Sequence, residues 1–210
     1  MATTTREFLE LDEIREGMVV LKDRSVRGIM LASSQNFALK SAEEQDAVIG
    51  QFQSFLNSLD FSIQIVIQSR KLNLTGYLDQ LKELEANQKN ELLKGLTQSY
   101  HAFVEQLIAG SSIMTKNFFV VVPFTLIETL PLDDRKRMPK IMGGLSDDDL
   151  QRMKTQLWQR MEFVALGLRR MGLKVAPLNS EELIELFWSW HHPKEAEIGY
   201  YPEIPPEIIR

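Results

Sequence analysis

The 210-residue chain contains no cysteine, and this absence excludes several kinds of site at once. It rules out disulfides, thiolate nucleophiles and cysteine-based zinc sites, and it leaves the redox compartment open. Histidine is almost as scarce, with only His101, His191 and His192. Adjacent histidines point in different directions on a helix or strand, so His191 and His192 form a poor chelating pair. We therefore expect no metal site, and we interpret the pair as the end of a helix before Pro193.

Long apolar runs are also missing. The most apolar stretch, 118–124, is far shorter than the ~20 residues that a membrane span needs. The first 15 residues contain four acidic side chains and no apolar run of signal-peptide length. We expect a cytoplasmic protein that reaches the inner membrane only peripherally, through a partner. A net charge of −5 and a pI near 5.4 argue against a broad nucleic-acid-binding surface.

Catalytic signatures are absent as well. A phosphate-binding P-loop needs G-x-x-x-x-G-K-[ST], and no Gly-Lys pair followed by Ser or Thr occurs in the chain. The pair Gly143–Gly144 is followed by Leu-Ser-Asp, which brings negative charge instead of lysine. No serine lies in a G-x-S-x-G motif, and the acids at 147–149 are explained more simply as a helix cap than as a cation site. We expect no enzymatic activity, no catalytic residue and no cofactor.

The composition that remains is ordinary for a folded domain, with 44% hydrophobic and 25% charged residues. After an irregular start, 18–22 and 26–32 read as two strands joined by a tight turn. Residues 61–68 alternate apolar and polar side chains, which predicts a strand with one buried face. Further strands are expected at 118–124, which should be fully buried, and at 173–177.

Helix signals fall between these strands. A capping box at Ser41–Glu44 opens a helix, and Asn179–Glu182 opens the final one. Residues 74–108 are helical in pattern but polar all round at 85–91, so either one helix of about 50 Å projects there or two helices meet at a bend. A further helix follows Ser146 and stops at Gly172. Its predicted buried face comprises Leu150, Met153, Leu157, Met161, Val164 and Leu168.

The interleaved order predicts an α+β fold. We expect a mostly antiparallel sheet of about five strands, with four helices packed on one face, including one long helix or helical hairpin. We divide the chain into an N-terminal extension (1–16), one α+β domain (17–192) and a proline-rich C-terminal tail (193–210).

Several segments together resemble a known family. They are Gly17–Asp23, Asn36–Gln45, Phe55–Asp60, Ile65–Arg70, Phe118–Pro123 and Phe163–Gly172. In these segments the chain is similar to the N-terminal, non-ATPase domain of the TraC-type conjugation ATPases, the motors of type IV secretion, and most of all to short proteins that consist of that domain alone. The resemblance implies an interaction domain that helps the motor to dock or to oligomerise. In those motors the nucleotide lies in a separate C-terminal domain.

We therefore expect a stand-alone, non-catalytic adaptor that binds a separately encoded P-loop secretion ATPase or a membrane component of the secretion channel. Homo-oligomerisation is compatible with this role. The alternative is a small-molecule or nucleotide-binding domain, or an enzyme, with a site that the sequence does not reveal.

Two groups of residues are candidates for such contacts. One of Trp188 and Trp190 must face away from the apolar stripe of the last helix, and an outward tryptophan suits a protein contact. The tail can dock as a strand or a polyproline segment, although wrapping over its own domain or disorder fits equally well. The candidate partner-binding residues are Trp188, Trp190, Tyr200, Tyr201, Ile204 and Ile208. The candidate basic patch is Arg70, Arg169 and Arg170, which requires the sheet ends to converge.

Overall fold

The computed structural model describes residues 10–71, 74–110, 114–125 and 147–193. The chain forms two compact units. The described part of the first unit comprises residues 10–67, 118–125 and 147–184, and that of the second comprises 68–71, 74–110, 114–117 and 185–193.

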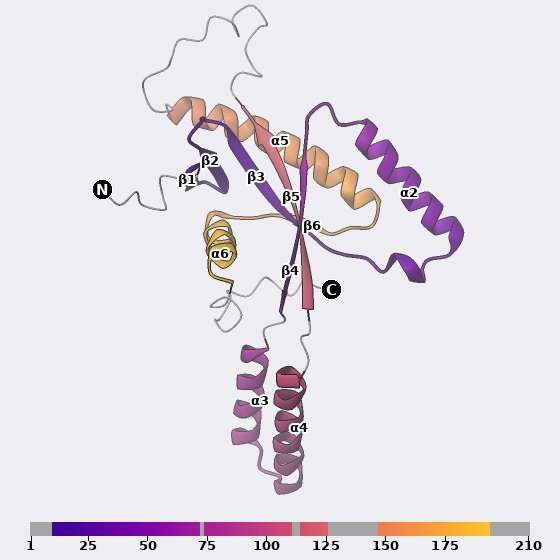
Figure 1. Ribbon diagram of the computed structural model, residues 1–210, viewed down its shortest axis with the longest axis vertical. Coiled ribbons are helices and arrows are strands. Elements are labelled where there is room, and N and C mark those ends of the chain that lie inside the picture. The colour runs from indigo at the N-terminus through magenta and orange to yellow at the C-terminus, as the bar shows by residue number, and fades with distance from the viewer. Residues whose placement is uncertain (1–9, 72–73, 111–113, 126–146, 194–210) are drawn as a thin grey trace, which may run out of the picture. The chain divides into compact units, whose positions relative to one another are not determined.

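A mostly antiparallel sheet of six strands runs through the fold (Figure 1). The strands follow the order β1-β2-β3-β5-β4, and β6 pairs with β3. Strands β1 and β2, β2 and β3, β3 and β5, and β3 and β6 are antiparallel. Their bounds are β1 Leu11–Arg15, β2 Met18–Leu21, β3 Val26–Ala32, β4 Gln64–Lys71, β5 Met114–Phe124 and β6 Val175–Pro177. Together with the helices, this sheet confirms the predicted α+β class.

Strand β1 replaces the irregular start that the sequence predicted, so that prediction was wrong. Its sequence, Leu-Asp-Glu-Ile-Arg, lacks a clear apolar alternation, and its residues are exposed or half-buried. A two-residue turn at Glu16 and Gly17 reverses the chain into β2, with φ of 54° and 75°. Two positive φ values match the type I′ turn, whose twist suits a hairpin. The Gly17 N–H also donates to Ser180 Oγ at 2.8 Å.

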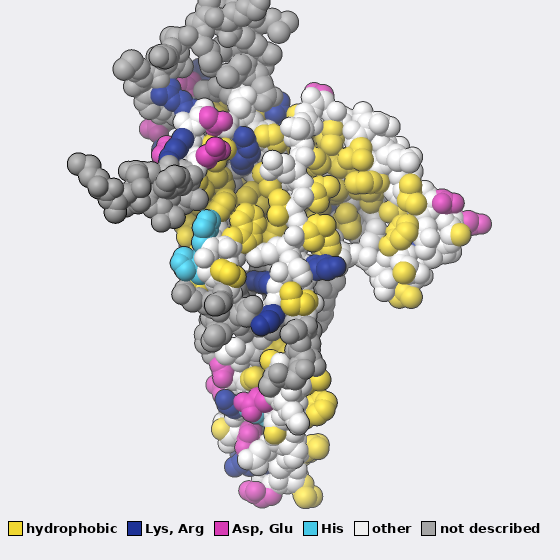
Figure 2. Space-filling model, viewed as in Figure 1, with side chains coloured by type: hydrophobic (Ala, Val, Ile, Leu, Met, Phe, Trp, Pro, Cys, Tyr) yellow, Lys and Arg dark blue, Asp and Glu magenta, His cyan; other side chains and the backbone are white. Residues whose placement is uncertain are grey.

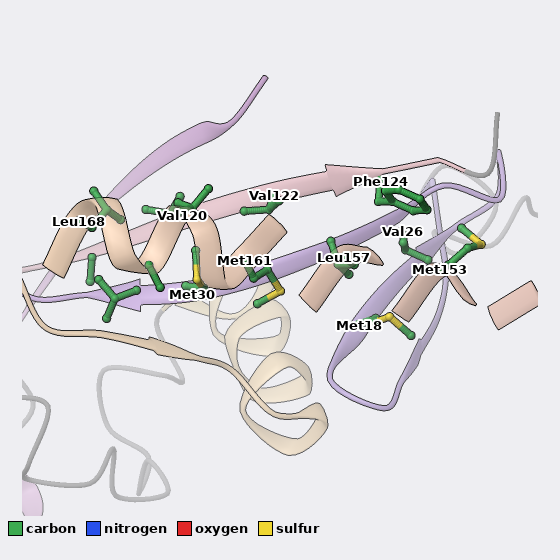
Figure 3. Close-up of a cluster of buried hydrophobic side chains, with 14 of the residues drawn as sticks. Met18, Val26, Met30, Val120, Val122, Phe124, Met153, Leu157, Met161 and Leu168 are labelled. Carbon is green, nitrogen blue, oxygen red and sulfur yellow. The ribbon is translucent and has the colours of Figure 1, made fainter. Parts of the chain in front are cut away.

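Helix α5 (Asp147–Arg170) supplies one layer of the core. All six residues of its predicted apolar face are buried. Figure 3 shows Met153, Leu157 and Met161 among side chains of β2, β3 and β5. The helix ends before Gly172, which has φ of 85° and therefore occupies the left-handed region that favours glycine.

Both faces of the central strands are buried, which the expectation of helices packed on one face did not predict. Met30 and Val122 belong to the core cluster that includes α5. Ile29, Leu31 and Val121, on the opposite face by the two-residue period of a strand, are buried as well. Near-continuous burial, not alternation, is typical of strands covered on two sides.

Strand β4 differs from its prediction in the opposite sense. Ile65 and Ile67 are 52% and 59% exposed, so the buried face predicted for residues 61–68 is wrong for its second half. The reason is position, since β4 lies at the edge of the sheet. Phe61 and Ile63, just before the strand, are the residues that pack against the core.

The long helical region consists of two helices, α3 (Thr75–Asn87) and α4 (Glu91–Gly110), which decides between the two predicted alternatives. Residues 88–90 join them, and the pair folds back as a hairpin (Figure 1). Leu81 of α3 and His101 and Val104 of α4 are buried. His101 is thus a packing residue inside the hairpin.

The stability that Glu16 contributes to the fold is expected to depend on pH. Lys154 Nζ lies 2.8 Å from its carboxylate and Gln151 Nε2 lies 3.1 Å away, and these hydrogen bonds hold the pKa of Glu16 below its usual value. A lowered folded-state pKa contributes stability above the unfolded value near 4.5, and this is lost as the pH falls through the lowered value. We expect Glu16→Gln to lower the melting temperature at pH 7 but by much less at pH 3.

Glu13→Gln serves as the matched control for this measurement. It removes the same charge from an exposed position of β1. Thermal melts followed by circular dichroism measure the loss of melting temperature at both pH values. For Glu13→Gln this loss should not become smaller at pH 3 in the way expected for Glu16→Gln. An equal effect of Glu16→Gln at pH 7 and pH 3 would contradict the ion-pair explanation.

Candidate functional site

An apolar groove lies between α2 (Ala42–Asn57) and α5 in the first unit. Its volume is about 460 Å³. Each helix contributes side chains one turn apart, so a single face of each forms a wall. The lining residues are Ala47, Gly50, Gln51, Ser54, Phe55 and Ser58 on the α2 side, and Phe163, Leu166, Gly167 and Arg170 on the α5 side.

The sequence of α2 explains why a groove forms. Ser41 and Glu44 make the predicted capping box, in which each side chain bonds the other residue's backbone N–H. Phe55 is the only buried residue of this helix. A Cβ built on Gly167 would lie 2.3 Å from Phe55 Cδ2, so the aromatic ring rests directly against the backbone of α5. A Cβ built on Gly50 would meet nothing within 4 Å. The helices therefore touch at Phe55 and leave a gap at Gly50.

The walls of the groove are apolar and partly open to solvent. Phe163 and Leu166 are 44% and 48% exposed. The hydroxyl groups of Ser54 and Ser58 already donate to the carbonyl oxygens of Gly50 and Phe55, at 2.9 and 2.7 Å. Arg170 is the one charged residue of the lining. The arrangement suits a ligand that offers apolar contacts along the groove and a negative group near Arg170.

A second hollow, of about 410 Å³, borders the other side of α2. Its lining includes Phe37, Ile49 and Phe52, together with Met171 and Leu173. Helix α2 buries a single residue, and its other large apolar side chains, Ile49, Phe52 and Leu56, remain exposed. Contiguous exposed apolar surface of this kind marks interaction sites on soluble domains. Figure 2 shows hydrophobic side chains gathered on this helix and the adjoining body.

The tryptophan prediction is confirmed in its geometry. Trp188 of α6 (Ser180–His191) is exposed, and its ring stacks on His192 with centroids 5.2 Å apart. Trp190 is half-buried and its ring contacts that of Phe187 edge-on at 5.4 Å. Trp188 is therefore the residue that faces outward. Their role as partner contacts stays a prediction, and the remaining candidates, Tyr200, Tyr201, Ile204 and Ile208, lie outside the described residues.

The three residues of the predicted basic patch belong to different parts of the fold. Arg169 donates to the Glu162 carboxylate at 3.3 Å and to the Val175 carbonyl at 3.2 Å, so it connects α5 to β6. Arg170 belongs to the wall of the groove. Arg70 belongs to the second unit, whereas Arg169 and Arg170 belong to the first. The convergence of the three stays a prediction.

Sequence reasoning did not identify the groove, although it singled out Arg170. The available signal was a second apolar strip on α5: Phe163 and Leu166 lie roughly 120° and 180° around the helix from the centre of the buried face. Excess apolar residues outside the core stripe of an amphipathic helix indicate a second contact surface.

Within the part of the chain that the structure describes, no group of histidine, aspartate and glutamate side chains could hold a metal ion. None of the described helices is long and apolar enough to cross a bilayer.

Comparison with known protein families identifies a match. No curated protein and no solved structure matches the chain. The family model described as the archaeal TraC-like domain matches residues 13–191, which include every described strand except the first part of β1 and all the described helices. The chain therefore belongs to the archaeal TraC-like domain family.

Proposed function

We propose that this chain is a non-catalytic interaction subunit of a conjugation or type IV secretion machine, and that it binds a separate P-loop ATPase or channel component through the α2–α5 groove. Membership of the TraC-like family associates the domain with conjugation and secretion. The observation that carries the proposal is the open apolar groove itself. No P-loop sequence is present in the chain, so the motor is a separate polypeptide or domain.

The energetics favour occupation of the groove by a protein segment. Burying one large apolar side chain completely contributes about 1.5–3 kcal/mol. Phe163 and Leu166 are each about half exposed and lie one turn apart. Covering both removes unfavourable hydration from the α5 wall. The hydroxyl groups on the α2 side are already hydrogen-bonded and need no partner.

The shape of the groove indicates the kind of segment. A trough between two helices accepts an amphipathic helix that presents apolar anchors at i and i+3 or i+4. Arg170 at one wall favours an acidic residue near the end of that helix. We therefore expect the partner to contribute an amphipathic helix with a carboxylate next to its apolar stripe.

A native pull-down of the full chain from its source cells tests this proposal. The expected result is recovery of a P-loop ATPase or a secretion-channel subunit, identified by mass spectrometry. Leu166→Glu places a charge in the apolar wall and should reduce recovery at least tenfold. Leu39→Glu is the matched control, because Leu39 is 83% exposed and does not line the groove. Circular dichroism should show both variants folded.

Two outcomes would contradict the proposal. Equal recovery with Leu166→Glu and Leu39→Glu would exclude the groove as the contact. Recovery of neither class of protein, from a lysate in which such a motor is demonstrably present, would remove the adaptor function. Deleting residues 200–210 in the same assay tests the predicted contact by the tail.

The volume of the groove also falls in the range of small-molecule pockets, which is the specific support for the alternative function. A thermal-shift panel with ATP and inorganic phosphate distinguishes the two. The adaptor proposal predicts no shift with either probe, and a shift abolished by Arg170→Gln would favour a phosphate-containing ligand.

A further inference from the structure

The α3–α4 hairpin of the second unit exposes one apolar side. On α4 the exposed apolar residues are Leu92, Leu93, Leu96, Tyr100, Phe103 and Leu107. Leu92 and Leu96 are 86% and 66% exposed, far above the values for core leucines. Figure 2 shows hydrophobic side chains along one edge of the α3–α4 part. The surface is distinct from the groove of the first unit.

Helical geometry shows that these residues form one stripe. At about 100° per residue, the six side chains fall within a sector roughly 100° wide. His101 and Val104, which are buried in the hairpin, fall in a neighbouring sector. The stripe therefore lies mostly outside the surface by which α4 contacts α3, with Tyr100 at the boundary.

The exposed surface continues onto α3. The hydroxyl groups of Tyr77 and Tyr100 are 3.2 Å apart, so Tyr77 lies beside the stripe. Leu84 lies two turns after Tyr77 on the same face of α3 and is 64% exposed. We call this two-helix surface, Tyr77 and Leu84 with the six residues of α4, the hairpin face.

The amount of apolar area is that of a stable interface. Large apolar side chains that are about half to four-fifths exposed make the hairpin face on the order of 700 Å², close to the ~800 Å² that each partner buries in a standard protein interface. Pairs of helices with one exposed apolar side commonly associate into four-helix bundles.

Four of the six residues in the stripe are spaced symmetrically, whereas the counterparts of Leu93 and Tyr100 would be Gln106 and Ser99. Leu92, Leu96, Phe103 and Leu107 follow one another at steps of four, seven and four, which read the same in both directions. In an antiparallel pair of α4 helices centred between positions 99 and 100, Leu92 would face the partner subunit's Leu107, and Leu96 would face the partner subunit's Phe103. A two-fold interface requires such self-complementarity, whereas contact with an unrelated partner does not.

Charge argues against other occupants of the hairpin face. The stripe itself contains no charged residue, so two copies can meet without repulsion. Residues 75–110 carry three lysines and five acidic residues, and this excess of negative charge disfavours anionic lipid and nucleic acid. Gly95 and Ser99 beside the stripe are small and leave room for a second helix to approach.

From these observations we infer that a second copy of this chain covers the hairpin face, with the two α4 helices antiparallel and the two hairpins forming a four-helix bundle. The dimer places the two α2–α5 grooves in one assembly, so it would present two copies of the proposed adaptor site. The inference does not depend on the function of that groove, and its test is separate.

Sedimentation velocity of the full chain between ~1 and 100 µM measures the association. We expect a concentration-dependent dimer. Leu96→Glu and Phe103→Glu should each weaken it at least 100-fold, because each places a charge in the centre of the face, and Leu96→Met should retain it. Leu39→Glu, at a more exposed site in the first unit, should leave the dimer intact. Circular dichroism establishes that each variant is folded.

Disulfide trapping tests the antiparallel arrangement, because the natural chain has no cysteine. Ser99→Cys lies next to the proposed two-fold axis and should form a covalent dimer under mild oxidation. Leu92→Cys should not, since its counterpart would lie about 20 Å away at 1.5 Å per residue.

A monomer throughout the concentration range, or a dimer that Leu96→Glu and Phe103→Glu leave intact, would overturn the inference. Cross-linking by Leu92→Cys but not Ser99→Cys would overturn the antiparallel arrangement. A failed pull-down with an intact dimer would overturn only the adaptor function.

Discussion

Replacing Phe55 by alanine is expected to lower the free energy of unfolding by roughly 3–5 kcal/mol, the usual cost of removing a buried aromatic side chain. Phe55 is 5% exposed and is the only residue by which α2 enters the core. Its ring rests against the backbone of α5 at Gly167, so removing the ring leaves a space beside that backbone. Loss of this contact should also release α2 and open the groove.

Urea unfolding followed by circular dichroism measures this effect. Phe52→Ala is the matched control, because it removes the same side chain from the same helix at a position that is 36% exposed. We expect it to cost about 1 kcal/mol or less, as is usual for sites near the surface. Equal losses for the two variants would contradict the role of Phe55 as the anchor. In hydrogen exchange, Phe55→Ala should increase exchange in α2 more than in α5, because α5 keeps its own buried face.

The second large effect concerns the contact between β3 and α5. A Cβ built on Gly28 would lie 2.1 Å from Met161 Sδ, and Met161 is only 2% exposed. The thioether is flexible, but Met161 belongs to the buried core cluster, so it must move among packed side chains. We expect Gly28→Ala to destabilise the fold by about 1–3 kcal/mol through overpacking, although alanine normally stabilises a strand relative to glycine.

A double-mutant cycle isolates this contact. Met161→Ala alone should cost about 2–5 kcal/mol through the cavity that it creates. In the Gly28→Ala background the same change should cost at least 1 kcal/mol less, because the new methyl group occupies part of the cavity. Gly50→Ala is the control glycine, since its Cβ meets nothing within 4 Å, and it should stabilise α2 by up to ~1 kcal/mol. Additive effects of Gly28→Ala and Met161→Ala would contradict the described packing.

The sequence predicted those elements whose signals are local. The capping boxes at Ser41–Glu44 and Asn179–Glu182 form as expected, with reciprocal side-chain and backbone hydrogen bonds. Such caps act within a single turn and depend little on the rest of the fold. The same holds for the buried face of α5, where a 3.6-residue period selects one side of the helix before any partner is known.

The wrong predictions concern residues whose environment is set by distant parts of the chain. Ile65 and Ile67 alternate as a half-buried strand should, yet the edge position of β4 leaves them exposed. Strand β1 shows little apolar alternation and forms because β2 offers it an antiparallel partner. Strand propensity depends on cross-strand neighbours more than on the strand itself, so neither outcome can be derived from the local sequence.

One of the candidate sites could be predicted from the local sequence, and the other could not. An outward tryptophan on the last helix followed from periodicity, and Trp188 is indeed the exposed one. The groove did not follow, because it requires Phe55 to hold α2 against Gly167 while Gly50 and Leu166 remain apart. These residues are more than 100 positions apart in the chain. Their juxtaposition depends on how two helices meet.

By itself, the sequence determined the α+β class, most helix boundaries, the main core face of α5, the absence of a P-loop and the likeness to TraC-type domains. Capping, periodicity and motif spacing are all local properties of a chain, which is why they could be read directly. Only the tertiary structure decided which apolar residues enter the core and which remain exposed in the groove and on the hairpin face. Leu96 and Leu157 are the same residue type on amphipathic helices, and only the packing of neighbouring elements makes one 66% exposed and the other fully buried.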